Sequence, residues 1–273
     1  MFNTIERDDL KTRLINMFKE ISGILGVVLV GSGAVGFDDE YSDIDFCVVV
    51  DDSREEIATE VMCKCSELIK QKFNVLKYQN MPQRFLQIYL MDNFIEVDIG
   101  FVRLGKLEAT RERWSICFDN TGKINKIMID SWDRIKNYHG KKTEVDICEQ
   151  YRRYYDTIWY YIVHSLIAIK RGQVWRGVYE INLIKDAAIA LHGYTLSLET
   201  KRYRNVDGFD ENFLLQLNKS YVKELEPNEM IRALKESIKL FFNEVEQYSE
   251  NLKFDDIEEY KKTMLGFIDS MSM

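Results

Sequence analysis

The residues whose types and spacing could do chemistry are concentrated in the segment 30–50, which reads V-GSGAVGFDDEYSDIDFCVVV. A short apolar run delivers Gly31 and Ser32, ten residues follow, and a second apolar run opens with Asp43 and Asp45. Residues i and i+2 of a strand point to the same side, so both carboxylates project from one face of a sheet. Two neighbouring carboxylates repel each other unless a cation neutralises them, and Mg²⁺ takes oxygen ligands of this kind. The pattern predicts a divalent-cation site.

The Gly-Ser pair before the acidic segment is suited to holding phosphate. Gly31 lets the backbone approach a ligand closely, and the Ser32 hydroxyl with nearby N–H groups can bind phosphate oxygens. The segment is not a Walker A loop, because the Gly-Lys-Ser/Thr sequence is missing. Gly31, Gly33 and Gly36 spell G-x-G-x-x-G, but neither a helix pattern nor a ribose-binding acid follows in the proper place. We therefore expect a phosphate site that is not a dinucleotide site.

A third acid is needed if an incoming hydroxyl is to be activated, and Asp98 is the candidate. It stands in the apolar strand sequence FIEVDIGF, on the face opposite Val97 and Ile99 and on the same face as Glu96. A carboxyl group in such a strand is costly to bury without a partner. The alternative is an edge-strand acid that faces water. For Asp43 and Asp45 the alternative is an exposed turn, shared with the acids at 38–40.

The elements that must position these residues can be outlined from periodicity. An amphipathic pattern predicts a first helix over 4–20, and Ser53 is expected to cap a second helix that runs to about residue 72. Apolar and alternating runs predict strands over 24–30, 44–50, 74–78, 84–90 and 94–102. From about residue 106 the period is helical, with helices expected over 148–171, 178–191, 228–248 and 255–268. The fold class is α+β, with a mixed-sheet domain over 1–105 and a helical bundle over 106–273.

Composition and charge limit the classes of function. The 273 residues include 37 Lys and Arg against 45 Asp and Glu, a net charge of −8, with a pI near 5.2. Residues 1–105 hold 11 basic and 18 acidic residues, a net −7, so nearly all the excess acid belongs to the first part. An acidic chain argues against a dedicated nucleic-acid binder. Five scattered cysteines and three distant histidines make a zinc site improbable. Without a signal-peptide pattern or a run of about 20 apolar residues, we expect a cytoplasmic protein with no membrane span.

The segment 152–204 departs from this acidity, because it holds nine basic residues against four acids. Arg176 and Glu180 lie four residues apart and would share a helix face. Arg176 could clamp phosphates, with Lys170 nearby in the sequence, while Glu180 orients the guanidinium or meets an acceptor. The alternative is a solvated ion pair. Aromatic residues in the same helices are more often core than base-stacking platforms; they are Tyr154, Tyr155, Trp159, Tyr160, Tyr161 and Trp175.

These motifs resemble those of a known family. Gly31-Ser32, ten residues, Asp43-x-Asp45 and a later strand aspartate are similar to the nucleotidyltransferase superfamily that includes polymerase β. The resemblance is closer to the antibiotic nucleotidyltransferases, the lincosamide and aminoglycoside adenylyltransferases. CFDNTGKI at 117–124 resembles the connector before their helical domain, and SLIAIKRGQVWRGVYEI at 165–181 resembles a helix pair of that domain. The match spans most of residues 25–190 and is most specific in its first half.

The resemblance implies a function and roles for individual residues. It implies metal binding by Asp43 and Asp45, phosphate contact by Gly31 and Ser32, and a metal or general-base role for Asp98. Mg²⁺ would be the cofactor and ATP, or another nucleoside triphosphate, the co-substrate. AMP would pass to a hydroxyl of a small molecule, expected to be an aminoglycoside or a lincosamide, with release of pyrophosphate. The first domain would be catalytic and the helical domain would bind substrate and nucleotide.

One departure from the family and two rival functions stay open. Many members carry Arg or another large polar residue at the position of Gly33, so a triphosphate contact is expected from elsewhere, with Arg176 and Lys170 as candidates. A first rival is an enzyme of the same fold that adenylylates a protein side chain. A second is a nucleotide-binding module without catalysis. The helices expected over 228–248 and 255–268 could close the bundle or form a homodimer seam.

Overall fold

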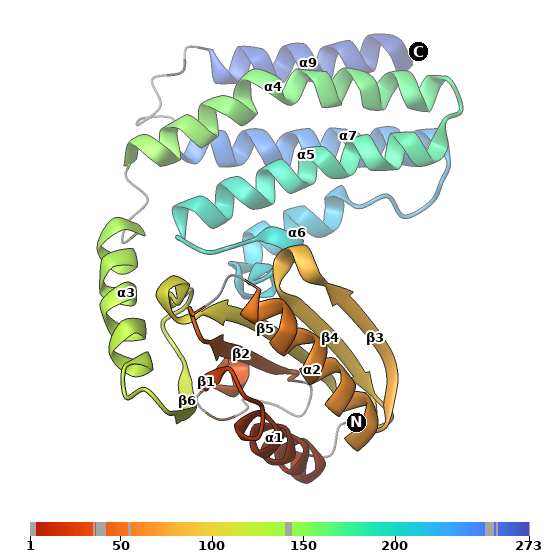
Figure 1. The fold of residues 1–273 in the computed structure, drawn as a ribbon. Helices are drawn as coiled ribbons and strands as arrows, with labels where there is room; N and C mark the ends of the chain where they lie inside the picture. Colours follow the sequence, from red (N-terminus) through yellow and green to blue (C-terminus); the bar gives the residue numbers. More distant parts are fainter. Residues whose placement is uncertain are drawn as a thin grey trace. The chain divides into compact units, whose positions relative to one another are not determined.

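The computed structural model of the chain describes residues 4–34, 36, 42–53, 56–139, 144–248, 254 and 256–272. The chain divides into two compact units, residues 1–140 and 141–273. The first contains a six-stranded sheet and the second is helical (Figure 1). The predicted fold class, α+β, is confirmed.

The sheet of the first unit is mixed, with strand order β3-β4-β5-β2-β1-β6. Only β2 and β5 pair in parallel, and each other neighbouring pair is antiparallel. The strands are β1 Ile24–Val30, β2 Ile44–Val50, β3 Val75–Met81, β4 Leu86–Met91, β5 Glu96–Arg103 and β6 Ser115–Asp119. The helices are α1 Thr4–Lys19, α2 Ile57–Lys72 and α3 Ile124–His139. The strand predicted over 24–30 and the strand predicted over 44–50 are confirmed residue for residue.

Both faces of the central strands are buried, which explains their continuous apolar sequences. On one face, alternate residues such as Val27 and Val48 pack in a core with residues of α1 and α2. On the other face, Val28 and Val49 pack against Ile124 and other residues of α3. Alternation therefore sends successive side chains of β1 into two different cores.

The first unit extends beyond the predicted domain boundary at residue 105. β6 pairs with β1, with Val28 opposite Ile116. α3, which follows β6, packs against Val28 and Val49 of the central strands. The compact unit therefore continues to residue 140. The connector motif at 117–124 thus includes the end of an edge strand. The sequence of β6, SICFD, is too short and too mixed in polarity to show the alternation of a strand, so this pairing could not be predicted.

The expected cap of α2 is also corrected. α2 begins at Ile57, and Glu56 occupies its N-cap position without a side-chain capping bond. The N–H of Ser53 instead donates to Asp51 Oδ1 at 2.7 Å, so Ser53 belongs to the turn that leaves β2. The side chain of Asp51, two residues earlier, bonds the backbone of Ser53 locally, and such a bond competes with helix capping.

The second unit is a bundle of helices: α4 Glu144–Lys170, α5 Val174–Thr195, α6 Glu211–Ser220, α7 Pro227–Gln247 and α9 Ile257–Ser272. α4 and α5 form a hairpin that turns at Gly172, whose φ of +67° is the left-handed conformation favoured by glycine (Figure 1). The core joins α4, α5 and α7 through residues such as Ile162, Ile184 and Phe241. The four predicted helices are confirmed, whereas α6 was not predicted. No helix in the described parts of the chain is long and apolar enough to cross a membrane.

Asp119, at the end of β6, organises the turn into α3. Its Oδ1 accepts hydrogen bonds from the Thr121 N–H at 2.8 Å, the Thr121 hydroxyl at 2.7 Å and the Gly122 N–H at 2.9 Å. Its Oδ2 accepts from the Ile124 N–H at 2.8 Å. Burial acts to raise the pKa of Asp119, but the bonds from Thr121, Ile124 and Gly122 outweigh it and hold the pKa below its ordinary value. The carboxylate therefore caps the start of α3 in its ionised form.

We expect Asp119→Ala to lower the free energy of unfolding by about 1–2 kcal/mol, the usual cost of a lost cap. Because the folded-state pKa is lowered, this contribution is complete above the ordinary carboxyl pKa and disappears as the pH falls through the folded value. Urea unfolding at pH 7 and at pH 3 measures both effects. Asn120→Ala is the matched control, since Asn120 bonds Leu25 through its backbone N–H. Equal losses for the two variants would contradict the capping role.

Candidate functional site

Two of the predicted acids lie side by side on neighbouring strands. β2 and β5 pair in parallel with Asp45 directly opposite Asp98, so their backbones are about 4.8 Å apart. Residues Ile44 and Phe46, on the other side of β2, pack in the core with α1 and α2. Asp45 and Asp98 therefore project from the opposite face. Asp43, half-buried just before β2, is two residues from Asp45 and falls on the same side by alternation.

The face that carries the acids is only partly covered. Further along the same strands, Cys47, Val49 and Val102 pack in the cluster formed with α3. Asp45 and Asp98 precede these residues and are not members of that cluster. They remain half-buried rather than closed in. The paired strands thus fix the backbone positions of the two carboxylates, and the half-buried side chains stay accessible to a ligand.

Electrostatics at Asp98 indicate a missing positive charge. Burial, followed by the negative charges of Glu96, Asp45 and Asp43, raises the pKa of Asp98 to about 7. Its Oδ1 is buried and has no hydrogen-bond partner among the described residues. A buried carboxylate oxygen without a partner is costly, and a bound cation would satisfy it.

The donor set fits a hard divalent cation, but it is not a closed cage. Among the described residues, no group of three or more His, Cys, Asp or Glu side chains is gathered closely enough to hold a metal ion. Mg²⁺ normally takes one or two protein carboxylates and completes its shell with water and substrate phosphates. Asp45 and Asp98 in register, with Asp43 beside them, suit an ion that arrives together with a phosphorylated substrate.

Gly31 is required by both its backbone and its surroundings. Its φ is +71°, and a Cβ at this position would lie 2.0 Å from Asp45 Oδ2. Ser32 follows in the 3₁₀ turn Gly31–Gly33 and is half-buried. Within the described residues, no hydrogen bond holds the Ser32 hydroxyl. The turn after β1 therefore brings its backbone against the Asp45 carboxylate, and Ser32 lies in the same turn.

Two residues near this site were given no role by the sequence analysis. Arg7 of α1 is 2 % exposed, and its Nη1 donates to the Ser42 carbonyl at 3.1 Å, which ties the segment before β2 to the helix. A signal was available, because Arg7 is three and seven residues before the buried Leu10 and Leu14. Glu96 is the largest charge acting on Asp98 after burial. The sequence could have indicated this effect, because Glu96 and Asp98 are two residues apart in one strand and so share a face.

Arg176, Glu180 and Lys170 lie in the helical unit. Arg176 Nε and Glu180 Oε1 are 3.6 Å apart, so the pair shares a face of α5 as predicted. Arg176 also lies 3.2 Å from His164 Nδ1, and its side chain is 44 % exposed. Glu180 is 8 % exposed, whereas Lys170 is exposed at the end of α4. Nη1 of Arg176 also donates to Gln173 Oε1 at 3.4 Å, so each nitrogen of this partly exposed guanidinium has a partner within the helical unit.

The nine basic residues of segment 152–204 do not form one patch. Arg176 is at the start of α5 and Lys201 lies beyond its end, which places them at opposite ends of a helix section about 28 Å long. Lys185, between them, is 1 % exposed, and its Nζ lies 3.7 Å from the centre of the Tyr221 ring. The excess of basic residues in the sequence is therefore distributed over separate surfaces.

The aromatic residues of the same helices are also divided. Tyr155 belongs to the core and stacks on Phe254 with ring centres 4.2 Å apart. Trp159 and Tyr160 are about half exposed, and Trp175 is 74 % exposed. The expectation of core positions is thus correct for only part of the set.

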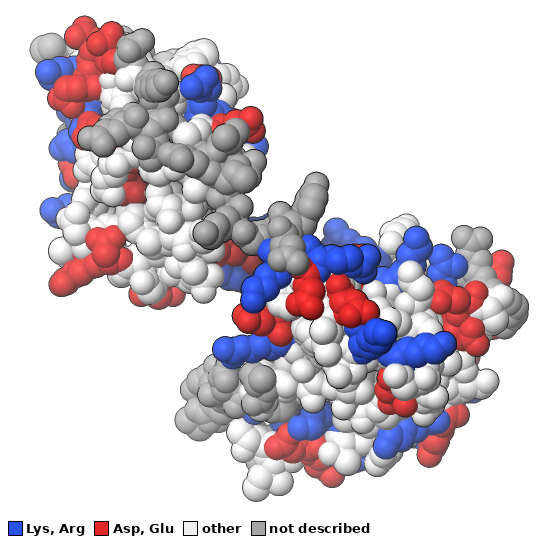
Figure 2. Space-filling model, turned by 90° about the vertical axis from the view of Figure 1, so that its left-hand side faces the viewer, with Lys and Arg blue, Asp and Glu red and all other residues white. Residues whose placement is uncertain are grey.

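The acidic net charge of the sequence argued against a dedicated nucleic-acid binder. On the face shown in Figure 2, the Lys and Arg side chains of both units are interleaved with Asp and Glu side chains. This face of the described chain lacks the continuous basic stripe with which a protein follows a phosphate backbone.

Comparison with known proteins identifies a domain in the first unit. Residues 11–97 match the family model described as nucleotidyltransferase domain. This stretch contains Gly31, Ser32, Asp43 and Asp45, and it ends one residue before Asp98. The resemblance to a nucleotidyltransferase domain that was stated from the sequence is confirmed over these residues. No curated protein sequence matches the chain.

Two solved structures are similar over most of their length at low identity. An aminoglycoside 6-adenyltransferase from Bacillus subtilis is 13 % identical, covers 95 % of this chain and 97 % of its own, and has a TM-score of 0.41. A nucleotidyltransferase-like protein from Exiguobacterium sibiricum is 11 % identical, covers 89 % of this chain and 76 % of its own, and has a TM-score of 0.37.

Proposed function

We propose that this chain, which contains a nucleotidyltransferase domain at residues 11–97, is a Mg²⁺-dependent adenylyltransferase. It transfers AMP from ATP to a hydroxyl of a small molecule and releases pyrophosphate. The observation that carries the proposal is the placement of Asp45 opposite Asp98, with an unpartnered Asp98 Oδ1 and the backbone of Gly31 close to Asp45. Such an arrangement serves phosphoryl chemistry, which depends mainly on positioning and charge stabilisation.

Each residue has a role in this proposal. Asp43, Asp45 and Asp98 would hold Mg²⁺, which when bound neutralises charge on the phosphates and the leaving group. Gly31 and Ser32 bind phosphate oxygens through the backbone N–H groups and the hydroxyl. Asp98, directly opposite Asp45 on the neighbouring strand, is placed to accept the proton of the acceptor hydroxyl. The acceptor oxygen then attacks the α-phosphorus, and the bond to the pyrophosphate oxygen breaks.

The helical unit is assigned to substrate binding. The Arg176 guanidinium is 44 % exposed and is oriented by Glu180, and its remaining N–H groups suit a phosphate oxygen. Lys170, exposed at the end of α4, adds a second positive charge. The acceptor class, an aminoglycoside or lincosamide, rests on the sequence motifs at 117–124 and 165–181.

The deciding experiment is pyrophosphate release with ATP and Mg²⁺, screened against aminoglycosides and lincosamides. Mass spectrometry of the acceptor should show one added AMP. Adenylylated protein after incubation with cell lysate would instead favour the protein-modifying rival. ATP binding without pyrophosphate release across all acceptors would favour the non-catalytic module.

Chelation of divalent ions should abolish transfer. With excess EDTA, we expect pyrophosphate release to fall to background, and added Mg²⁺ should restore it, because the crowded carboxylates need a cation to bind a triphosphate. Circular dichroism before and after chelation is the control, since both units have cores that contain no metal ligand. Full turnover in EDTA would contradict the metal assignment.

A further inference from the structure

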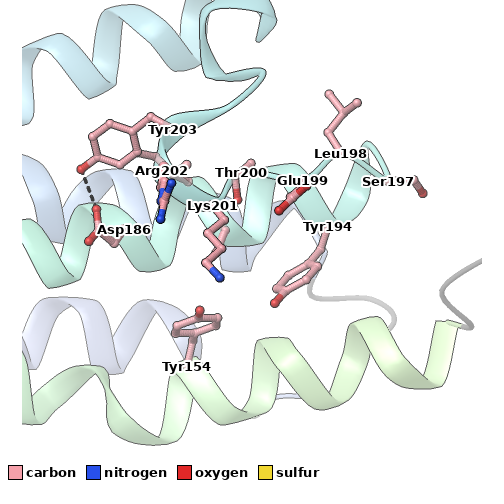
Figure 3. Close-up of a pocket in the computed structure, with 12 residues that line it drawn as sticks. Tyr154, Asp186, Tyr194, Ser197, Leu198, Glu199, Thr200, Lys201, Arg202 and Tyr203 are labelled. Carbon is pink, nitrogen blue, oxygen red and sulfur yellow. Dashed lines mark hydrogen bonds between the residues drawn. The ribbon is translucent and has the colours of Figure 1, made fainter. Parts of the chain in front are cut away.

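The helical unit contains a pocket that the proposed transfer reaction does not use. It has a volume of about 800 Å³ and lies between α4, α5 and the segment 197–203 that follows α5 (Figure 3). Pockets for small molecules are typically about 300–1,000 Å³. The lining residues are Tyr154, Asp186, Ile189, Ala190, Tyr194, Ser197, Leu198, Glu199, Thr200, Lys201, Arg202 and Tyr203.

The segment 197–203, which we call the pocket loop, is held in a strained conformation. Ser197, Arg202 and Tyr203 have φ values of 56°, 59° and 59°, in the left-handed region that non-glycine residues rarely adopt. Backbone strain of this kind concentrates at ligand sites. It persists only where the surroundings fix the backbone.

Specific contacts provide that fixation. The Tyr203 hydroxyl donates to Asp186 Oδ1 at 2.6 Å, and the Asn205 side chain donates to the Glu199 carbonyl at 2.9 Å. Leu198 N–H donates to the Gly193 carbonyl at 2.8 Å. A Cβ on Gly193 would lie 2.3 Å from a methyl carbon of Thr200, so this glycine lets the loop lie close to α5. The pocket wall is therefore preformed.

The interior of the pocket suits a ring. Tyr154 of α4 and Tyr194 of α5 direct their side chains into the space below the loop (Figure 3). Ile189, Ala190 and Leu198 supply apolar lining. Aromatic side chains stack favourably on the flat ring of a ligand.

Two cations of the pocket loop offer a position for an anion. Lys201 extends from the loop toward Tyr154 (Figure 3), and within the described chain neither Lys201 nor Arg202 forms an ion pair. The lining also contains two carboxylates: Asp186, which accepts a hydrogen bond from the neutral Tyr203 hydroxyl, and Glu199. Glu199, at the other end of the loop, remains as an acceptor for a ligand hydroxyl or amino group.

We propose that this pocket binds a small ring-bearing molecule with an anionic group, its ring between the two tyrosines and its phosphate or carboxylate at Lys201 and Arg202. Such a ligand would pair with two cations that have no ion-pair partner among the described residues, and it would fill a preformed cavity, which reduces the entropy cost of binding. A polycation would place its charges against Lys201 and Arg202.

The test uses AMP as the probe, by isothermal titration calorimetry in EDTA on the full chain carrying Asp45→Asn. This background separates pocket binding from transfer activity, so either can fail alone. We expect AMP to bind more tightly than adenosine, which lacks the phosphate, and more tightly than inorganic phosphate, which lacks the ring. Lys201→Ala should weaken AMP binding about tenfold or more, the usual value of a charged hydrogen bond. Arg204→Ala removes a charge from the same region outside the pocket lining and should change the affinity less than about twofold.

Three results would overturn the proposal. One is binding of AMP that Lys201→Ala leaves unchanged, and another is adenosine binding as tightly as AMP. The third is kanamycin, a polycation, binding in competition with AMP and more tightly after Lys201→Ala. Circular dichroism of each variant confirms folding, which is expected because both substituted side chains are exposed.

Discussion

Asp45→Asn is expected to abolish Mg²⁺-dependent nucleotidyl transfer while leaving the fold intact. The substitution keeps the size of the side chain beside Gly31 but removes one of the negative charges that face Asp98. Loss of one preorganised electrostatic group typically costs a factor of about 10² to 10³ in turnover. Pyrophosphate release with ATP, Mg²⁺ and an accepted substrate measures the effect. Turnover equal to the wild type would refute the assignment.

A matched control is available at the other end of the same strand. Asp51 directly follows β2, about 20 Å along the chain from Asp45, and accepts a hydrogen bond from the Ser53 N–H that Asn can also accept. Asp51→Asn therefore makes the same change in net charge away from the site. We expect near-normal turnover for this variant and equal unfolding midpoints for both.

The central sheet could be predicted from sequence because its signal is strong and local. Strands buried on both faces must be apolar throughout, so β1 and β2 appear as uninterrupted runs. The i, i+2 spacing placed Asp43 and Asp45 on one face. That Asp45 lies directly opposite Asp98 could not be predicted, since it depends on parallel pairing between segments about 50 residues apart.

Other features depend on tertiary context that a sequence pattern does not record. β6 is a short edge strand, and its pairing with β1 is stabilised by α3 beyond it. The left-handed residues of the pocket loop, Ser197, Arg202 and Tyr203, have no glycine signal. Their conformation follows from contacts with Asp186 and the backbone of α5. Charge counts likewise placed Lys201 with Arg176, although the length of α5 separates them.

Gly31→Ala is expected to impair catalysis although it removes no functional group. A Cβ would lie 2.0 Å from Asp45 Oδ2, so the carboxylate must move by more than an ångström or the turn must open. Displacements of about 1 Å at a reacting centre can reduce turnover about a hundredfold. The left-handed φ of +71° adds about 1–2 kcal/mol of strain. We therefore expect lower stability together with a large loss of pyrophosphate release.

Gly122→Ala separates the two effects of that substitution. Gly122 has a φ of +67°, nearly that of Gly31, but a Cβ there would meet nothing within 4 Å. Gly122→Ala should lose about 1–2 kcal/mol in urea unfolding from backbone strain alone, and Gly31→Ala should lose at least as much because its methyl group also meets Asp45. Only Gly31→Ala should lose activity, because only there does the new methyl group meet a carboxylate of the proposed metal site. If Gly122→Ala reduced turnover equally, the loss would come from backbone strain, and the close approach of Gly31 to Asp45 would have no catalytic role.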